Sequence, residues 1–352
     1  MMKYAMLDNV KQGDQLGKSI YTGDGRVLLE EGVVLTIGLI SRLRQMGVSA
    51  IYLRDDRLKD VELEEVVTET TRREVIQTFA ESVQYIQNSK KEFDLKGISK
   101  STEKIIEEIL QNQNVLISLT DIRTNDNALF VHSTNVCIMS VLIGIKLGLS
   151  RNEIKDLGMG ALLHDIGKII DPSKLETKTV KASNETNDHT WVGFNYLRRK
   201  HEISTVAAHV ALGHHENVNG TGYPRKISGE QIPLFAKIVA VANFYDNLVS
   251  PAEGTVALKP HEACERIMGL TNIYFDHEVV WEFLRTIAFY PTGRQVKLTT
   301  GETGVIVGQN HGLPQRPIVR VFDVYNRSKF DDYDVKEIDL SKQTTIFITK
   351  VL

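Results

Sequence analysis

Cysteine is scarce in this 352-residue chain, with only Cys137 and Cys264 present. Both lie in apolar segments with helical spacing, which favours buried free thiols over a disulfide or a metal-binding pair. A zinc finger is excluded, because structural zinc sites of that kind use cysteine ligands.

Long apolar runs and an excess of one charge are also absent. No apolar run approaches the ~20 residues that a membrane-spanning helix needs. The best candidate, Val136–Leu149, contains Lys146 and is too short, so we expect a buried helix in a cytoplasmic protein, with no membrane partner. The formal net charge is only −3. Proteins that bind nucleic acid polymers need clustered Lys and Arg to displace counterions, so we expect no such partner.

The N-terminal part of the chain, residues 1–58, mixes strand and helix signals. Strand-like runs at 19–21 and 27–29 flank an Asp-Gly pair that suits a hairpin turn. Apolar residues recur at helical spacing over 36–46, and 50–53 is again strand-like. The unit has no cluster of ligand-type residues, so we interpret it as a small α/β regulatory domain.

The rest of the chain divides by pattern into three parts. Residues 59–116 repeat apolar positions three and four apart without proline, which predicts a helical linker. Residues 117–290 form a run of amphipathic helical patterns broken by Gly and Pro loops. Residues 291–352 contain short strand-like runs at 296–298, 304–307, 318–322 and 345–349, separated by Gly, Asn and Pro turns, which predict a small β subdomain.

Histidine and aspartate gather at the ends of the predicted core helices. The segments are Phe130–Thr134, Ala161–Lys168, a helix that begins at His189, Leu212–Pro224 and Phe235–Leu248. A capping box of Ser150 and Glu153 predicts the start of the helix that ends at Ala161–Lys168. His164 and Asp165 follow an apolar run, and two such groups buried without partners would cost several kcal/mol each. A metal satisfies both, and the same holds for His214 and His215. Each histidine alone is more readily explained as structural, but four such helix ends together favour a metal centre.

Imidazole and carboxylate ligands suit iron, manganese or, less specifically, zinc. Asp165 has two oxygens and could bridge two metals, which would hold an attacking hydroxide and stabilise an in-line displacement at phosphorus. Lys168 lies one turn beyond His164. It either neutralises a substrate phosphate or is a solvated lysine favoured by the helix dipole.

These segments resemble the HD-GYP family of bacterial cyclic di-GMP phosphodiesterases, a branch of the HD-domain phosphohydrolases. The resemblance covers about 117–290 and rests on His164–Lys168, His214–Pro224 and Ile232–Asp246, in family order. The tail from Tyr290 resembles a β appendage common in the family. The implied fold is mainly α, an HD-domain helical bundle with a small α/β N-terminal unit and a small β C-terminal appendage.

The resemblance also implies a function and a site. The function is hydrolysis of the cyclic di-GMP phosphodiester by metal-activated hydroxide, in bacterial second-messenger signalling. One metal would be held by His132, His164 and Asp165, and the second by Asp165, His189, His214 and His215. Asp165 and Lys168 would be catalytic. The Gly222-Tyr223-Pro224 loop would join Lys168 in substrate binding and contact a signalling protein, and a homodimer is an option.

Three departures from the family keep alternatives open. Asn243 stands where the family has its last metal-binding carboxylate. Its amide oxygen can still bind the metal, though more weakly, and Asp246, one turn on, could partly compensate. The family's basic segment, which grips the substrate phosphates, is replaced by Ser250–Val256. Ala128 occupies the place of an acid that a third metal would need. The alternatives are a catalytically weak receptor or signalling module, and a phosphohydrolase of another phosphorylated substrate.

Overall fold

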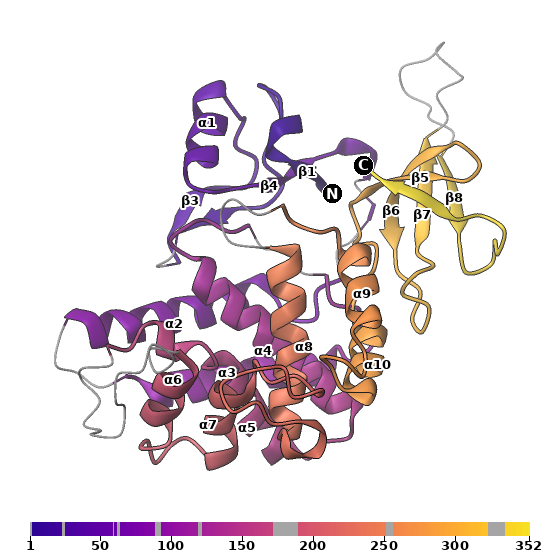
Figure 1. Cartoon of the computed structure of the whole chain (residues 1–352). Coiled ribbons are helices and arrows are strands. Elements are labelled where there is room, and N and C mark those ends of the chain that lie inside the picture. The colour runs from indigo at the N-terminus through magenta and orange to yellow at the C-terminus, as the bar shows by residue number, and fades with distance from the viewer. Residues whose placement is uncertain are drawn as a thin grey trace, which may run out of the picture.

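The computed structural model describes residues 2–22, 25–58, 60–61, 64–88, 93–118, 122–171, 189–250, 256–322 and 335–352. Its helices are α1 (Ile37–Gln45), α2 (Glu69–Asn88), α3 (Leu95–Gln111), α4 (Ala128–Lys146), α5 (Arg151–Leu162), α6 (His189–Leu197), α7 (Thr205–Gly213), α8 (Leu234–Val249), α9 (Pro260–Gly269) and α10 (His277–Thr286). Its strands are β1 (Met2–Met6), β2 (Ile20–Tyr21), β3 (Val27–Leu29), β4 (Ala50–Arg54), β5 (Gln295–Leu298), β6 (Thr303–Gly308), β7 (Ile318–Phe322), β8 (Val335–Asp339) and β9 (Ile348–Val351). The fold is mainly α, as expected (Figure 1).

The N-terminal unit consists of two short antiparallel strand pairs and one helix. β2 pairs with β3 and β1 pairs with β4, and α1 packs beside them (Figure 1). Leu39 N–H donates to the Thr36 hydroxyl at 3.2 Å, so a threonine cap fixes the start of α1. The predicted strands and helix are confirmed. The hairpin turn falls partly outside the described residues, and β1 was not predicted.

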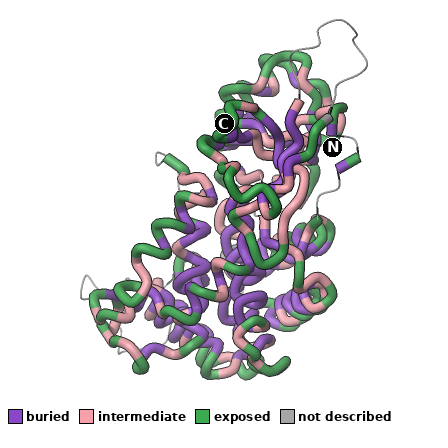
Figure 2. The backbone as a smooth tube through the Cα atoms, turned by 90° about the vertical axis from the view of Figure 1, so that its right-hand side faces the viewer, coloured by how far each residue is buried: buried purple, intermediate pink, exposed green. Residues whose placement is uncertain are grey.

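Helices α2 to α10 share one apolar core, which fills the interior of the helical part (Figure 2). Val75 and Phe79 of α2 and Ile98 and Ile105 of α3 belong to this core together with residues of α4 to α10. The segment predicted as a linker is helical, and its helices are packed into the main bundle. The exact domain boundaries stay a prediction.

The most apolar stretch of the sequence forms the central helix, α4. Of the helices in the described part of the chain, it alone is long and apolar enough to cross a membrane, with 19 residues and a mean hydropathy of 1.8 over its best window. The buried helix predicted at 136–149 corresponds to α4, which begins earlier, at Ala128, and includes polar residues in its first half. Thr134 is accommodated by donating its hydroxyl to Phe130 O at 2.8 Å. Since 78% of that window is buried inside the fold, α4 is a core helix.

The C-terminal region is a five-stranded antiparallel sheet with the order β8-β7-β6-β5-β9. β5, β6 and β7 match the predicted strands, β9 begins at Ile348 rather than Thr345, and β8 was not predicted. The sheet lies beside the N-terminal unit (Figure 1). Tyr4 N–H donates to Gly293 O at 3.2 Å, and Arg320 binds Asp60 through two hydrogen bonds of 2.7 and 2.6 Å.

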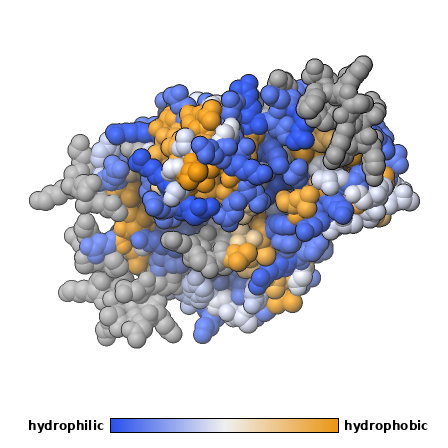
Figure 3. All heavy atoms as spheres, turned by 90° about the horizontal axis from the view of Figure 1, so that it is seen from above, coloured by the Kyte–Doolittle hydropathy of each residue, from blue (hydrophilic) through white to orange (hydrophobic). Residues whose placement is uncertain are grey.

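Seen from above, the molecule is mostly hydrophilic, with apolar side chains gathered in a few places (Figure 3). The large exposed apolar residues of the N-terminal unit are Met6, Val27, Val34 and Ile37. The apolar centre of the N-terminal unit is separate from that of the helical bundle and includes Leu16, Leu35, Leu43 and Ile51.

Candidate metal centre

The ends of four helices bring the predicted ligands together. His132 lies in the second turn of α4, and His164 and Asp165 lie in the turn that follows α5. His189 is the first residue of α6, and His214 caps the end of α7. The expected capping box at the start of α5 is confirmed, since Ser150 and Glu153 bond reciprocally.

Gly167 allows α6 to approach this turn. A Cβ atom built at Gly167 would lie 2.6 Å from Gly193 N and closer still to the carbonyl of His189. A larger residue would therefore push the start of α6 away from the turn. The glycine after the His-Asp pair thus sets the distance between Asp165 and His189.

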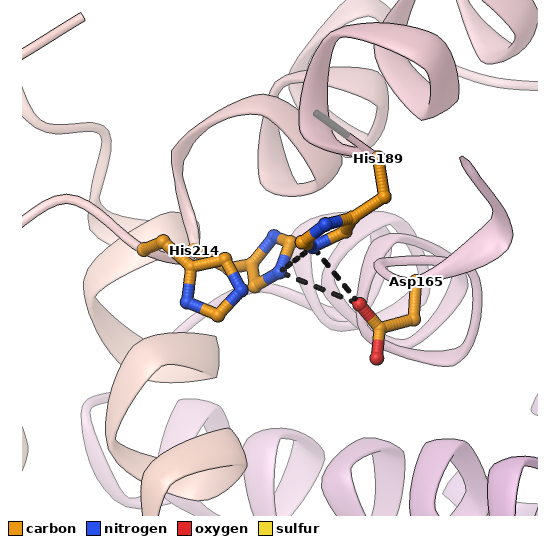
Figure 4. A group of neighbouring side chains, drawn as sticks. Asp165, His189 and His214 are labelled. Carbon is orange, nitrogen blue, oxygen red and sulfur yellow. Dashed lines mark hydrogen bonds and ion pairs between the residues drawn. The ribbon is translucent and has the colours of Figure 1, made fainter. Parts of the chain in front are cut away.

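The ligand atoms form two groups that share Asp165. One group is His132, His164 and Asp165, and the other is Asp165, His189, His214 and His215. Within each group the candidate ligand atoms lie within 4.8 Å of one another. Asp165 Oδ2 is 3.4 Å from His164 Nε2, whereas Oδ1 is 3.3 Å from His189 Nε2 and 3.6 Å from His214 Nε2 (Figure 4). Each carboxylate oxygen therefore faces a different group.

Hydrogen bonds on the outer side of the rings fix which nitrogen carries the proton. His164 Nδ1 lies 2.8 Å from Ala161 O, and His214 Nδ1 lies 3.1 Å from Val210 O. A carbonyl oxygen only accepts, so in each ring Nδ1–H donates. In the neutral imidazole this leaves the Nε2 lone pair directed into the site, which is the arrangement typical of metal-binding histidines.

The inner nitrogens are arranged in a way that a cation would satisfy. His132 Nε2 lies 3.3 Å from His164 Nε2, and His189 Nε2 lies 3.4 Å from His214 Nε2. His132 Nδ1 donates to Asp246 and His164 Nδ1 donates to Ala161 O, so the two facing Nε2 lone pairs of His132 and His164 cannot hydrogen-bond to each other. Asp165 Oδ1 is also buried and accepts no hydrogen bond from the described residues. Imidazole nitrogens and a carboxylate are suitable ligands for divalent iron, manganese or zinc, so the residues present fit such metals.

Burial keeps His214 and His215 of the second group neutral, because it lowers the pKa of both rings. It lowers the pKa of His214 to about 4. Burial, followed by the neighbouring His214 and His189, lowers the pKa of His215 to about 2. Burial alone would raise the pKa of Asp165, but His164 and His214 outweigh it and hold that pKa well below its usual range. At neutral pH these two rings are therefore neutral imidazoles and Asp165 is a carboxylate, which are the ligating forms.

Asp246 binds the His132 ring on the side that faces away from His164. Its Oδ2 accepts from His132 Nδ1 at 2.5 Å, on the side of the ring opposite the nitrogen that faces His164. Its Oδ1 accepts from Arg123 Nη2 at 2.6 Å and from Asn135 Nδ2 at 3.2 Å. Burial alone would raise the pKa of Asp246, but Arg123 and His132 lower it far more. Asp246 is thus an orienting carboxylate for His132 and is not part of either group.

Asn243 and Lys168 complete the set of predicted residues. Asn243 is buried on α8, and its Oδ1 accepts from Asn247 Nδ2 at 2.8 Å. Lys168 Nζ lies 2.6 Å from Asp165 Oδ2, and its side chain is 49% exposed. The ammonium therefore lies beside the ligand shared by both groups and still reaches solvent. Of the replaced basic segment, residues 251–255 lie outside the described residues.

The Gly222-Tyr223-Pro224 loop lies against the second group. The Tyr223 ring stacks on His215 with centroids 4.6 Å apart and an angle of 18° between the planes. Gly222 has no room for a side chain, since a Cβ atom there would lie 2.5 Å from His215 O. Buried Glu216 accepts from Arg225 N at 2.8 Å and from Ile227 N at 3.2 Å. These contacts fix the loop beside His215.

The structure brings together the six predicted His and Asp residues and leaves the other histidines outside both groups. Those others are His201, His209, His261, His277 and His311. Sequence reasoning missed the polar residues behind His132, which are Arg72, Arg123 and Asn135. Asn135 could have been suspected from the sequence, because it lies one helical turn after His132 on the same predicted helix. Nothing in the sequence pattern pointed to the two arginines. Cys137 and Cys264 are free and buried, as expected.

Comparison with known proteins agrees with this geometry. Residues 105–279 match the family described as "HD domain", and residues 295–352 match the family described as "KOW domain associated with HD domain". A cyclic di-GMP phosphodiesterase of Pseudomonas aeruginosa is 31% identical over 233 residues, which are 65% of this chain and 56% of that protein. One of Thermotoga maritima is 32% identical over 188 residues, 52% of this chain and 50% of that protein.

A cyclic di-GMP phosphodiesterase response regulator of Xanthomonas campestris is 40% identical over 114 residues, 31% of this chain and 30% of that protein. The chain therefore spans about half or less of the length of these relatives. The helical bundle with its shared His-Asp site defines a protein with an HD domain, followed here by a KOW domain. Within that class, these matches support the resemblance of the chain to the HD-GYP family.

Proposed function

We propose that this chain is a metal-dependent phosphodiesterase that hydrolyses a cyclic dinucleotide, with cyclic di-GMP as the substrate. The observation that supports this most directly is the pair of ligand groups joined by the two oxygens of Asp165. Paired metal sites are a common solution for phosphoester hydrolysis, because both the attacking and the leaving oxygen need stabilisation. The relatives named as cyclic di-GMP phosphodiesterases supply the substrate class.

The proposed cofactor is a pair of divalent transition metals, iron or manganese. His132, His164 and Asp165 would hold one, and Asp165, His189, His214 and His215 would hold the other. When bound, the metals would lower the pKa of a water molecule and offset the charge of the phosphate oxygens. Asn243 would contribute a neutral amide oxygen, so the first group carries less negative charge than a set with a carboxylate at that position.

Asp165 and Lys168 have the clearest chemical roles among the chain's own residues. Asp165 fixes the separation of the two groups, because one rigid carboxylate faces both. Lys168 is held by Asp165 and is half-exposed, so its ammonium can donate to a phosphate oxygen at the rim of the site. A positioned cation there stabilises negative charge that develops on the phosphate during displacement.

The loop at 222–224 would recognise the substrate next to these groups. The Tyr223 ring is 43% exposed and is supported from behind by His215. An aromatic ring held in this way is a suitable surface on which a guanine base can stack. We extend the proposal to a cytoplasmic protein whose exposed Tyr223 also contacts a signalling partner.

One observation favours a second candidate, a receptor that binds metal and nucleotide with little turnover. Asn243 has no charge, and its oxygen accepts a hydrogen bond from Asn247, so it binds a cation less strongly than a carboxylate. The first group would then hold its metal weakly. Weak occupancy of one group reduces hydrolysis more than it reduces substrate binding.

Metal content and turnover, measured together, test the proposal. Protein purified without oxygen should contain up to two iron or manganese ions per chain and should hydrolyse cyclic di-GMP. His164→Ala should lose metal and activity. His209→Ala is the matched control, because His209 lies on α7 outside both groups and should keep both properties. Metal-free wild-type protein under all growth conditions would refute the proposal, and bound metal without hydrolysis would favour the receptor.

A further inference from the structure

A chain of hydrogen bonds connects α2 to the metal-facing histidine of α4. Arg72 Nη2 donates to Asn135 Oδ1 at 2.7 Å, and Asn135 Nδ2 donates to Asp246 Oδ1 at 3.2 Å. Asp246 Oδ2 in turn accepts from His132 Nδ1 at 2.5 Å. All four residues are buried. Three successive hydrogen bonds therefore link Arg72 to the His132 ring, whose other nitrogen, Nε2, faces His164.

Arg72 determines which way the Asn135 amide points. A guanidinium has donors only, so the atom of Asn135 that faces it must be the carbonyl oxygen. The amide NH₂ is then directed at Asp246, where it donates. Without Arg72, the amide can turn and present its oxygen to a carboxylate, which is repulsive. Asp246 would lose a donor and with it one constraint on the position of His132.

We propose that Arg72 is a positioning residue for the metal group formed by His132, His164 and Asp165. This inference rests on the proposed metal centre and goes beyond it. Arg72 lies on α2, outside residues 105–279 that match the HD domain family. Its effect passes through Asn135 and Asp246, which hold His132 with its Nε2 directed at His164. Among the described residues, the second group meets this chain of hydrogen bonds only at the shared Asp165, which lies 3.7 Å from His132 Nε2.

The position of Arg72 also depends on the N-terminal unit. Lys18 binds Glu65 at 3.1 Å and Glu69 at 3.2 Å, and Glu69 lies one turn before Arg72 on α2. A cavity of about 50 Å³ lies at the same junction, lined by Lys18, Tyr21, Arg72, Asn127 and Val131 among others. A space of this size accommodates a few water molecules. The first turn of α2 therefore joins the N-terminal unit to the residue that orients Asn135.

A buried guanidinium at this position costs free energy of folding, so its presence indicates a specific role. Arg72 is 8% exposed, and taking a charged group out of water costs several kcal/mol before its partners are counted. A methionine has a similar length and would fill the space without that cost. A purely structural role would therefore predict that Arg72→Met changes stability only. A positioning role predicts a change in metal binding at one group.

The test is a manganese titration of the full-length chain, with chelator competition to resolve the two metals. Removing an outer-shell partner commonly weakens metal affinity about 10- to 100-fold. Arg72 acts one residue further out, so Arg72→Met should weaken only the weaker-bound metal, by about tenfold. Arg72→Lys keeps a donor for Asn135 and should restore most of the affinity. Arg73→Met is the control, because Arg73 is the exposed neighbour on the same helix.

A double-mutant comparison distinguishes a specific effect on the metal group from a general loss of folding. If Arg72 acts through Asn135, the effects of Arg72→Met and Asn135→Ala on the weaker metal should not add. Additive effects, equal weakening of both metals, or unchanged affinity in Arg72→Met would each refute this inference. If Arg72→Met does not fold, the same comparison uses Arg72→Lys and Asn135→Ala. Wild-type protein that binds no metal would instead refute the proposed function.

Discussion

Acid should destabilise the metal-free protein in a pH range set by its buried histidines. His214 is 1% exposed, and burial lowers the pKa of its imidazole to about 4. At pH 5 the ring is neutral in the folded protein, whereas in the unfolded chain, where its pKa is about 6.5, it carries a proton. The unfolded state binds more protons, so the free energy of unfolding falls as the pH drops from about 6.5 towards 4.

The magnitude follows from the size of that pKa change. A decrease from 6.5 to about 4 corresponds to about 3 kcal/mol of stability for His214, lost over this pH range. His215, with its pKa lowered to about 2, acts in the same direction. Asp165 and Asp246 also have lowered pKa values, but their contributions are present above about pH 4 and are lost only below it. The range between pH 6.5 and 4 therefore reports on the histidines.

Urea unfolding of chelator-treated protein at pH 7, 6 and 5 measures this effect. Wild type should lose about 2 kcal/mol or more between pH 7 and 5, and His214→Gln should lose clearly less. His209→Gln should behave like wild type. Saturating manganese should raise the free energy of unfolding at each pH without removing the pH dependence, because it binds rings that are already neutral in the folded protein. The same pH dependence in wild type and His214→Gln would refute the argument that the buried ring stays neutral.

Three further predictions concern single residues. Asp246→Asn removes the charge behind His132 and should weaken one of the two metals about 10- to 100-fold, measured by chelator competition; equal loss of both metals would contradict the assignment of Asp246 to His132 alone. Asn243→Asp should raise metal occupancy of the weaker group, measured by manganese titration, because a carboxylate adds a negative charge beside the cation; unchanged affinity would show that residue 243 is not near the metal. Gly167→Ala should weaken metal binding by the His189 group and cost about 1–3 kcal/mol of stability in urea unfolding, because the added methyl group meets the backbone of α6. Gly269→Ala, where a Cβ atom meets nothing within 4 Å, is its control, and equal effects would count against the close packing of α6.

The candidate ligands could be predicted because their signal is local. His164 with Asp165, and His214 with His215, are adjacent pairs that follow apolar helical runs, and each pair alone suggests buried polar groups that need a partner. The network behind His132 could not be predicted in this way. Arg72 and Asn135 are 63 residues apart, and Arg123 and Asp246 are 123 apart. An arginine in a charged helix such as α2 is typically solvated, and only the tertiary packing buries this one.

The helices and strands also divide into those that local sequence signals predict and those that depend on distant parts of the chain. The helices with clear caps, such as α1 at Thr36 and α5 at Ser150, begin where the sequence predicts. β1 and β8 were missed because apolar and polar residues do not alternate regularly in either segment. Only Ala5 of β1 and Ile338 of β8 are described as buried. β1 pairs with β4, and β8 pairs with β7. Each strand therefore depends on a hydrogen-bonding partner that its own local sequence does not reveal.

The central claim is that Asp165 joins two metal sites. Anomalous diffraction from manganese-loaded crystals tests it most directly, because it locates each metal independently of activity. We predict two peaks about 3.5–4 Å apart, one on each side of the Asp165 carboxylate. The first should lie beside His132 and His164, and the second beside His189, His214 and His215. A single peak, or two peaks that do not share Asp165, would contradict the account.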